Sequence, residues 1–234
     1  MFFKTKKGKR ITLVIIFLVI VLMILAGGGY FLNKKKSDSN NIPPIVKQII
    51  ALNEDIKKTT IAIYNTSGKL AGISMAQSRI TDIKKAIELI GSLRQLVEEN
   101  QNAIDRLLQF IDDNAGFFHR KNLYWVFFIK EFYMDHDVMQ HHKSRANYLL
   151  TFETLLKYTY TNFKNIMELQ SQQHMRNYDA YYMRYRRAAD SHNKFNKKRI
   201  AFQTTFVEEH PEVNPFLPGA HQLGPFKFWD KFSF

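Results

Sequence analysis

The chain contains no cysteine, which excludes disulfide bonds, cysteine-ligated zinc sites, thiol catalysis and acylation at a cysteine. It also lacks an acidic excess, because 34 lysine and arginine residues face 21 aspartate and glutamate residues, for a formal net charge of +13. Such a surplus suits anionic partners such as lipid headgroups, nucleic acid or acidic envelope polymers. Hydrophobic residues make up 45% of the 234 residues, which argues against wholesale disorder.

Proline and glycine are missing from most of the chain. All six prolines lie outside residues 45–210, and glycine is absent from residues 117–210. Neither turn dipeptides nor strand-like alternation interrupts these stretches. Long uninterrupted segments of this kind favour helix. The sequence therefore predicts an all-α fold.

Enzyme signatures are missing as well. The chain has no P-loop, no Gly-x-Gly-x-x-Gly, no Gly-x-Ser-x-Gly and no His-Glu-x-x-His motif. Its carboxylate pairs, such as Glu98 with Glu99, are adjacent in sequence and diverge by about 100° on a helix, so they do not form a shared acid–base site. We expect a non-catalytic protein without a cofactor.

Residues 11–32 form a long uncharged hydrophobic run, ITLVIIFLVIVLMILAGGGYFL. As a helix, these residues span roughly 33 Å, about the thickness of a bilayer core. A cleaved signal peptide is the alternative, because a basic segment precedes the run and Ala26 lies before three glycines. The run exceeds the usual hydrophobic region of a signal peptide. It therefore predicts a retained, single-pass transmembrane helix.

Basic residues on the two sides of this run predict its orientation. Five precede it within residues 1–10, and four follow closely, Lys34, Lys35, Lys36 and Lys47. This bias predicts a cytoplasmic tail at residues 1–10 and an extracytoplasmic domain after the membrane span. We expect the span to lie in a bacterial inner membrane and the domain to lie in the periplasm. Residues 33–44 form a polar linker ending in two prolines.

Apolar residues after the linker recur at helical spacing. A first seam, weakened twice by threonine, uses alternating steps of four and three, and a second seam follows after a phase slip near Gly68 and Gly72. One long helix with local overwinding and two packed helices both fit, with two helices slightly favoured. The seams consist of Ile45, Ile49, Leu52, Ile56, Thr59, Ile63, Thr66, Leu70 and Ile73, then Ala76, Ile80, Ile83, Ile87, Ile90, Val97, Ile104 and Ile111.

Three further segments complete the predicted architecture. Residues 112–116 form a break with Gly116 as a helix stop, residues 117–140 form the most buried helix, and residues 144–208 form a long final helix. The expected fold is thus an N-terminal transmembrane helix, an elongated helical bundle with coiled-coil-like seams over residues 45–210, and an irregular aromatic tail at residues 211–234.

Asp137 and His141 are the candidate metal ligands. They are four residues apart and share a helix face, and carboxylate and imidazole both bind divalent metals. A third ligand has to come from elsewhere, with Glu131 and His174 as candidates. A pH-responsive histidine cluster is another interpretation. The interpretation we favour is a polar helix end before a turn at residues 142–144.

Residues 184–199 are strongly basic and follow a group of tyrosines. Arginine beside tyrosine can grip phosphate or stack on bases. An extracytoplasmic location argues against nucleic acid and favours an anionic lipid or wall polymer. The alternative is an ordinary solvated helix face. The candidate polyanion-binding residues are Arg184, Arg186, Arg187, Lys194, Lys197, Lys198 and Arg199.

Residues 211–234 hold four prolines, two glycines and alternating aromatic residues. The stabilisation expected from burying these rings is close to the entropic cost of ordering the segment, so the tail needs a surface to dock on. That surface is either its own bundle or a partner, which the tail could join as an added strand. The candidate docking residues are Phe216, Phe226, Phe228, Trp229, Phe232 and Phe234.

These features predict a non-catalytic, membrane-anchored assembly component of a cell-envelope complex of the secretion, pilus, motility or division type. It would form homo- or hetero-oligomers through its helical seams and its aromatic tail. The alternative is an extracytoplasmic sensor or ligand-binding helical domain that works with a separate signalling partner.

Overall fold

The computed structural model describes residues 42–73, 79–167 and 171–219. Every regular element in these ranges is a helix, which confirms the all-α prediction. The chain divides into two compact units, Met1–Gln48 and Ile49–Phe234, and nearly all described residues belong to the second. The predicted transmembrane run at residues 11–32 lies outside the described ranges, and no helix inside them has the length and apolarity needed to cross a bilayer.

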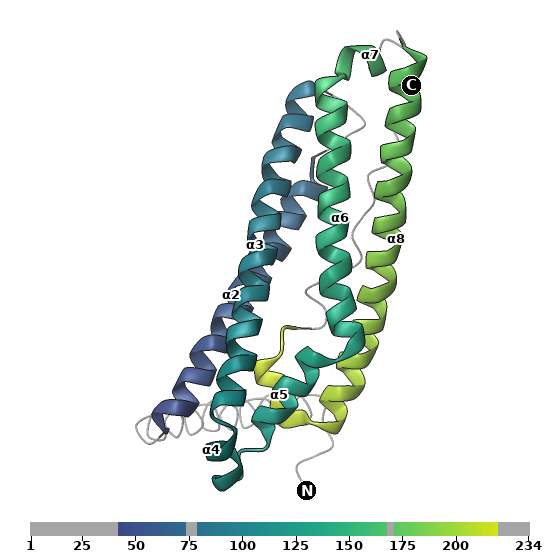
Figure 1. Ribbon diagram of the computed structural model, residues 1–234. Coiled ribbons are helices and arrows are strands. Elements are labelled where there is room, and N and C mark those ends of the chain that lie inside the picture. Colours follow the sequence, from purple (N-terminus) through teal and green to yellow (C-terminus); the bar gives the residue numbers. More distant parts are fainter. Residues whose placement is uncertain (1–41, 74–78, 168–170, 220–234) are drawn as a thin grey trace, which may run out of the picture. The chain divides into compact units, whose positions relative to one another are not determined.

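Four long helices build the second unit (Figure 1): α2 (Pro44–Ala71), α3 (Ile80–Asp113), α6 (His136–Thr161) and α8 (Gln172–Glu209). Helix α6 packs against both α3 and α8, and α3 also contacts α2. At one end lie the short α4 (Ala115–Arg120), α5 (Trp125–Met134) and the 3₁₀ helix η3 (Pro211–Phe216), and at the other lies α7 (Phe163–Met167). The described residues thus form a helical bundle.

The predicted seams are largely confirmed. Residues seven apart fall on one stripe of a helix, and two such rows are buried. Two separate helices, rather than one continuous helix, carry them, since α2 ends at Ala71 and α3 begins at Ile80. Ile80 itself is 43% exposed at the start of its helix. The buried rows are Ile49, Ile56, Ile63 and Leu70 on α2, and Ile83, Ile90, Val97, Ile104 and Ile111 on α3.

The single helix predicted for residues 117–140 is wrong. The chain breaks at Asn122, which has a φ of 54°, a left-handed conformation that asparagine tolerates better than most residues. It breaks again at Asp135, whose side chain accepts hydrogen bonds from the backbone N–H groups of Asp137 (2.8 Å) and Val138 (3.2 Å) and so caps α6. The turn predicted at residues 142–144 is also wrong, because that segment lies inside α6.

The long final helix predicted for residues 144–208 is also broken. Helix α6 ends at Thr161, where the side-chain amide of Asn162 donates to the carbonyl of Tyr158 (2.9 Å). Helix α8 begins after Ser171, whose hydroxyl accepts from the N–H of His174 (3.5 Å). The apolar pattern continues across this break, and periodicity alone therefore hides it.

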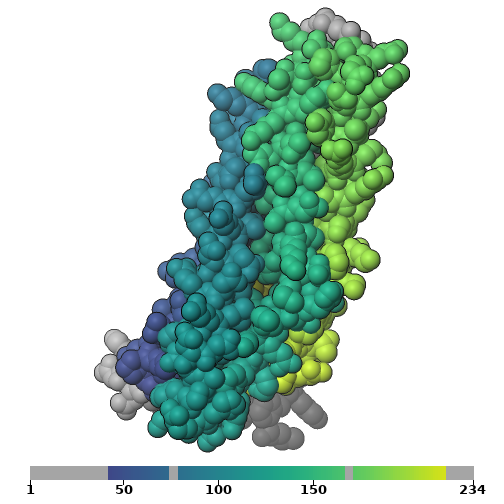
Figure 2. All heavy atoms as spheres, viewed as in Figure 1, coloured from purple at the N-terminus to yellow at the C-terminus, as the bar shows by residue number. Residues whose placement is uncertain are grey.

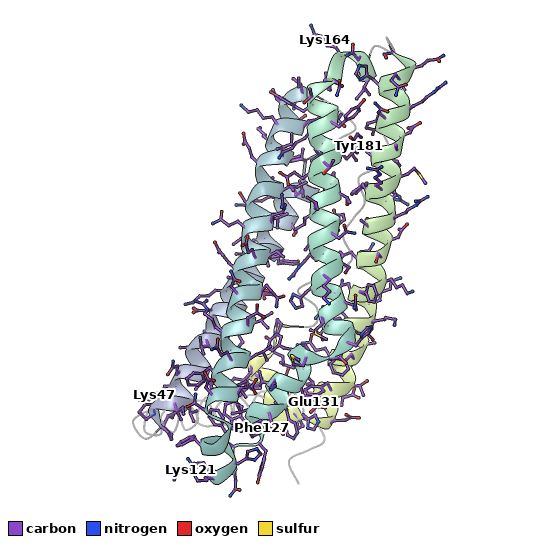
Figure 3. The ribbon with its side chains drawn as sticks, in the orientation of Figure 1. Lys47, Lys121, Phe127, Glu131, Lys164 and Tyr181 are labelled. Carbon is purple, nitrogen blue, oxygen red and sulfur yellow. The ribbon has the colours of Figure 1, made fainter. Side chains whose placement is uncertain are left out.

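The core changes character along the bundle. Toward α7 it is apolar and aromatic, with Tyr158 and Tyr181 packed at a ring distance of 4.8 Å (Figure 3). Toward α5 it becomes polar, although the side chains are just as buried. The buried members of this second group, here called the polar core, are Asn53, Thr60, Asn100, Tyr133, His141, Ser144, Arg145, His192, Asn196, Arg199 and Gln203.

Residues 210–219, here called the strap, run from the end of α8 back across the bundle. Val213 and Leu217 are buried, and the carbonyl of Pro215 accepts a hydrogen bond from the Lys57 ammonium of α2. The carbonyl of Pro218 accepts one from the amide of Gln203 on α8. The strap therefore connects the first and last long helices of the bundle.

Candidate anion site in the bundle core

Two arginines lie in the polar core without an acidic partner among the described residues. Arg145 on α6 is 2% exposed and Arg199 on α8 is 3% exposed. Arg145 Nη2 donates to Asn100 Oδ1 (3.5 Å), and Arg199 Nη1 donates to Gln203 Oε1 (2.7 Å). These acceptors are neutral amides, and within residues 42–73, 79–167 and 171–219 neither guanidinium forms an ion pair.

The two guanidinium groups remain charged at neutral pH. Burial and the neighbouring Arg199 lower the pKa of Arg145 to about 10, and burial lowers the pKa of Arg199 to about 10. A buried charge without a counter-charge costs several kcal/mol even after local relaxation. The polar core thus holds two positive charges, and no carboxylate in the described residues compensates them.

Three histidines surround these arginines. The rings of His141 and His192 stack with centroids 5.0 Å apart, and His142 Nδ1 lies 3.1 Å from Arg145 Nη2. Burial, followed by the positive field of Arg145, lowers the pKa of all three, for His192 to about 3. At neutral pH the histidines are therefore uncharged. They add hydrogen-bonding nitrogen atoms but no further charge.

A small cavity lies among these side chains. Its volume of about 20 Å³ exceeds the roughly 10–15 Å³ that one water molecule needs. Three buried lining atoms make no hydrogen bond, the Tyr133 hydroxyl, His141 Nδ1 and Arg145 Nε. The cavity is lined by Ile56, Thr60, Asn100, Ile104, Phe132, Tyr133, Val138, His141, His142, Arg145, Arg199 and Pro218.

The composition of this lining favours an anion over a cation. Arginine only donates hydrogen bonds, and the hydroxyl of Tyr133 can do so. In the part of the chain that the structure describes, no carboxylate contributes to the lining. Charge-assisted bonds from a guanidinium are among the strongest that proteins make to carboxylate or phosphate oxygens. The cavity is therefore a candidate site for a small anion or for the anionic group of a larger molecule.

The two predicted metal ligands point to different surroundings. His141 is buried in the polar core, whereas Asp137 lies nearer the surface with its carboxylate 3.4 Å from the Lys198 ammonium. Of the candidate third ligands, Glu131 is exposed on α5 (Figure 3), and His174 lies beside Tyr158 near α7. No three His, Cys, Asp or Glu side chains of the described residues are arranged to hold a metal ion. The metal site stays a prediction.

Most of the predicted polyanion-binding residues lie on the surface. Arg184, Arg187, Lys194, Lys197 and Lys198 are exposed, and Arg186 is half-buried. Arg199 differs, because it belongs to the polar core. It follows His192 and Asn196 at helical spacing on the buried face of α8. The sequence interpretation grouped it with the surface residues because the residues around it are basic.

Of the predicted docking residues, the structure describes only Phe216. Its ring stacks on Trp125 of α5 with centroids 4.5 Å apart. The other candidates, Phe226, Phe228, Trp229, Phe232 and Phe234, lie outside the described residues.

Sequence reasoning missed the role of Arg145, Asn100 and Tyr133. A usable signal is present on α6, where the buried positions recur at steps of three and four. The row consists of Val138, His141, Arg145, Tyr148 and Phe152. Two of its members, His141 and Arg145, are polar or charged. An arginine on a buried row is the feature that separates this site from a solvated helix face.

Comparison with protein-family models, curated proteins and solved structures finds no match for the chain.

Proposed function

We propose that this protein is a non-catalytic, membrane-anchored helical domain that binds an anionic ligand in its polar core. The observation that carries this proposal is the pair Arg145 and Arg199, buried beside a cavity with no counter-charge from any described residue. An anion there would neutralise part of their charge and accept hydrogen bonds from Tyr133 and from Arg145 Nε. The domain would pass on the binding signal through a separate membrane partner.

Binding of an anion makes a specific prediction about stability. A ligand that binds only the folded state raises the free energy of unfolding in proportion to the logarithm of its concentration. The full chain, purified in a neutral detergent, would be unfolded thermally at constant ionic strength in chloride, nitrate, phosphate or acetate, and followed by circular dichroism. We expect at least one of these anions to raise the unfolding temperature by an amount that grows with the logarithm of its concentration.

Matched arginine variants make the test specific. Arg199→Gln should abolish this rise in the unfolding temperature, whereas Arg187→Gln, which removes an exposed arginine from the same helix, should keep it. In buffer without a binding anion, Arg199→Gln should be no less stable than the native chain, because it removes an uncompensated buried charge. An equal response in both variants, or none in the native chain, would sink the proposal.

Assembly into an envelope complex is the second candidate function. Its support is the contact between Phe216 and Trp125, in which the first aromatic residue of the tail packs ring on ring. Residues further along the tail would make similar contacts with a neighbouring subunit. The test is a photocrosslinking amino acid at Phe228 in native membranes. A defined adduct that disappears when Trp229 and Phe232 become alanine supports assembly, and adducts confined to the same chain contradict it.

A further inference from the structure

A groove runs between α3 and α6 and ends beside the candidate anion site. Its volume is about 890 Å³, within the range typical of ligand pockets. Figure 2 shows this face of the bundle, with α3 and α6 side by side. Along α3 the lining runs from Gly91 to Ile104, a separation of thirteen residue steps that corresponds to ~20 Å of helix.

The floor of the groove is mainly apolar. Val97 and Leu149 are buried there, Leu150 is exposed although large and apolar, and Ala146 and Gly91 leave the groove wide. A Cβ atom placed on Gly91 would meet nothing within 4 Å. Charged groups line the groove as well: Arg94 pairs with Glu153, and Glu98 and Lys143 are exposed side chains on α3 and α6. An apolar chain could therefore lie along the floor while Glu98 and Lys143 stay in contact with solvent.

The groove and the cavity share three lining residues, Ile104, Tyr133 and His142. His142 Nδ1 is 3.1 Å from Arg145 Nη2, and the Tyr133 hydroxyl has no hydrogen-bond partner. One end of the groove therefore lies beside the cavity that holds the buried guanidinium groups, while the rest of its surface is mainly apolar. The polarity of these two adjacent spaces matches a molecule with one anionic end and one apolar end.

We propose that the ligand of this domain is a long-chain carboxylate, with its head at Arg145 and Tyr133 and its unbranched chain in the groove between α3 and α6. This inference rests on the proposed anion-binding function and adds the class of ligand. The length of the ligand's hydrocarbon chain follows from the length of the groove. The negative charge of its head group follows from the two guanidinium groups. Lys143, which also lines the groove, adds positive charge near the same end.

The test uses the full chain in phosphatidylcholine nanodiscs, so that no detergent competes for the groove. A long-chain fatty acid that carries a photoreactive diazirine would be crosslinked to the protein and the modified peptides identified by mass spectrometry. We expect adducts within residues 91–104 and 139–150. Unlabelled dodecanoate should compete with them, with the competing affinity rising about three- to fourfold for each added methylene between octanoate and dodecanoate.

Controls separate the head from the chain. Dodecyltrimethylammonium should not compete, because its head is cationic. Ala146→Trp, which fills the groove, should abolish the adducts, whereas Ala180→Trp, at an exposed alanine of α8, should keep them. Arg145→Gln should weaken competition by dodecanoate at least tenfold.

The outcomes distinguish this inference from the function on which it rests. One outcome is that small anions stabilise the native chain through Arg199, but the adducts fall outside the groove or persist in Ala146→Trp. In that case the core binds an anion, and the proposal of a long-chain carboxylate is wrong. If competition is equally strong for dodecyltrimethylammonium, the groove binds apolar chains without regard to charge, and the inference fails. If neither anions nor fatty acids respond to the arginine variants, both proposals fail.

Discussion

The rings of Trp125 and Phe216 stack with centroids 4.5 Å apart and planes inclined by 16°. This contact joins α5 to η3 and holds the strap against the bundle. At the start of the strap, His210 stacks on Phe128 with ring centroids 3.9 Å apart, so two aromatic contacts join the strap to α5. The strap is consequently a structural part of the bundle rather than a loose extension of α8.

Replacing Phe216 with alanine should therefore destabilise the fold. We expect a loss of about 1–3 kcal/mol, below the value for a fully buried phenylalanine because this ring is half-buried. Urea unfolding followed by circular dichroism measures the change. Phe216→Leu, which keeps apolar area but loses stacking, should recover part of it. A Phe216→Ala variant as stable as the native chain would show that the strap contact contributes nothing.

Acid should destabilise the protein through the core histidines. Burial, together with the positive charges of Arg145 and Arg199, lowers the pKa of His192 from the ordinary 6.5 to about 3. The unfolded chain then binds more protons, so the stabilisation is complete above pH 6.5 and is lost as pH falls toward 3. Each such histidine contributes a slope of about 1.4 kcal/mol per pH unit.

Urea unfolding between pH 7.5 and pH 4.5 would measure this slope. His192→Gln should flatten the acid limb, and His136→Gln, at an exposed position of α6, should leave it unchanged. A bound anion should also flatten it, because negative charge beside the histidines favours their protonated forms. Identical slopes for the native chain and His192→Gln would show that this histidine does not stay neutral in the fold.

Two helical glycines offer a gain in stability. An added Cβ would meet nothing within 4 Å at Gly68 on α2 or at Gly91 on α3. Alanine at either position should raise the free energy of unfolding by about 0.5–1 kcal/mol, because it restricts the unfolded chain without a clash. Thermal unfolding measures both variants. A loss of stability in Gly91→Ala would mean that the groove is narrower than the structure has it.

Asn100 should couple α3 to α2. Its amide nitrogen donates to the hydroxyls of Thr59 (2.8 Å) and Thr60 (3.2 Å) and to the carbonyl of Ile56 (3.2 Å). A double-mutant cycle with Asn100→Ala and Thr60→Ala should give a coupling free energy of about 1 kcal/mol. Thr154→Ala, which lies on an exposed part of α6, serves as the uncoupled partner. Additive effects for Asn100 and Thr60 would contradict the contact.

The seams of α2 and α3 could be predicted from the sequence because apolar residues at seven-residue spacing have one stable solution, burial along a stripe. The breaks at Asn122, Asp135 and Asn162 could not. Each depends on a side chain bonding to the local backbone or on an unusual φ, and the apolar pattern continues through it. Helix existence was thus easier to predict than helix ends.

The polar core could be predicted only in part. His141 was identified as a possible ligand, but its partners Arg145, Tyr133 and Asn100 come from positions far apart in sequence, and nothing in the spacing brings them together. Arg199 was assigned to the surface because the basic residues around it dominate that segment. Which of several basic residues faces inward depends on the packing of α6 against α8, and this packing is a tertiary property.

The bond from Lys57 to Pro215 joins residues 158 positions apart. Walls of the same small cavity come from α2 at one end of the described chain and from the strap at the other, with α3, α5, α6 and α8 contributing between them. A partly folded chain that lacks either extreme has no cavity to offer. Any molecule that occupies it would therefore favour only the completed fold, and its release would weaken the two ends of the domain at the same moment.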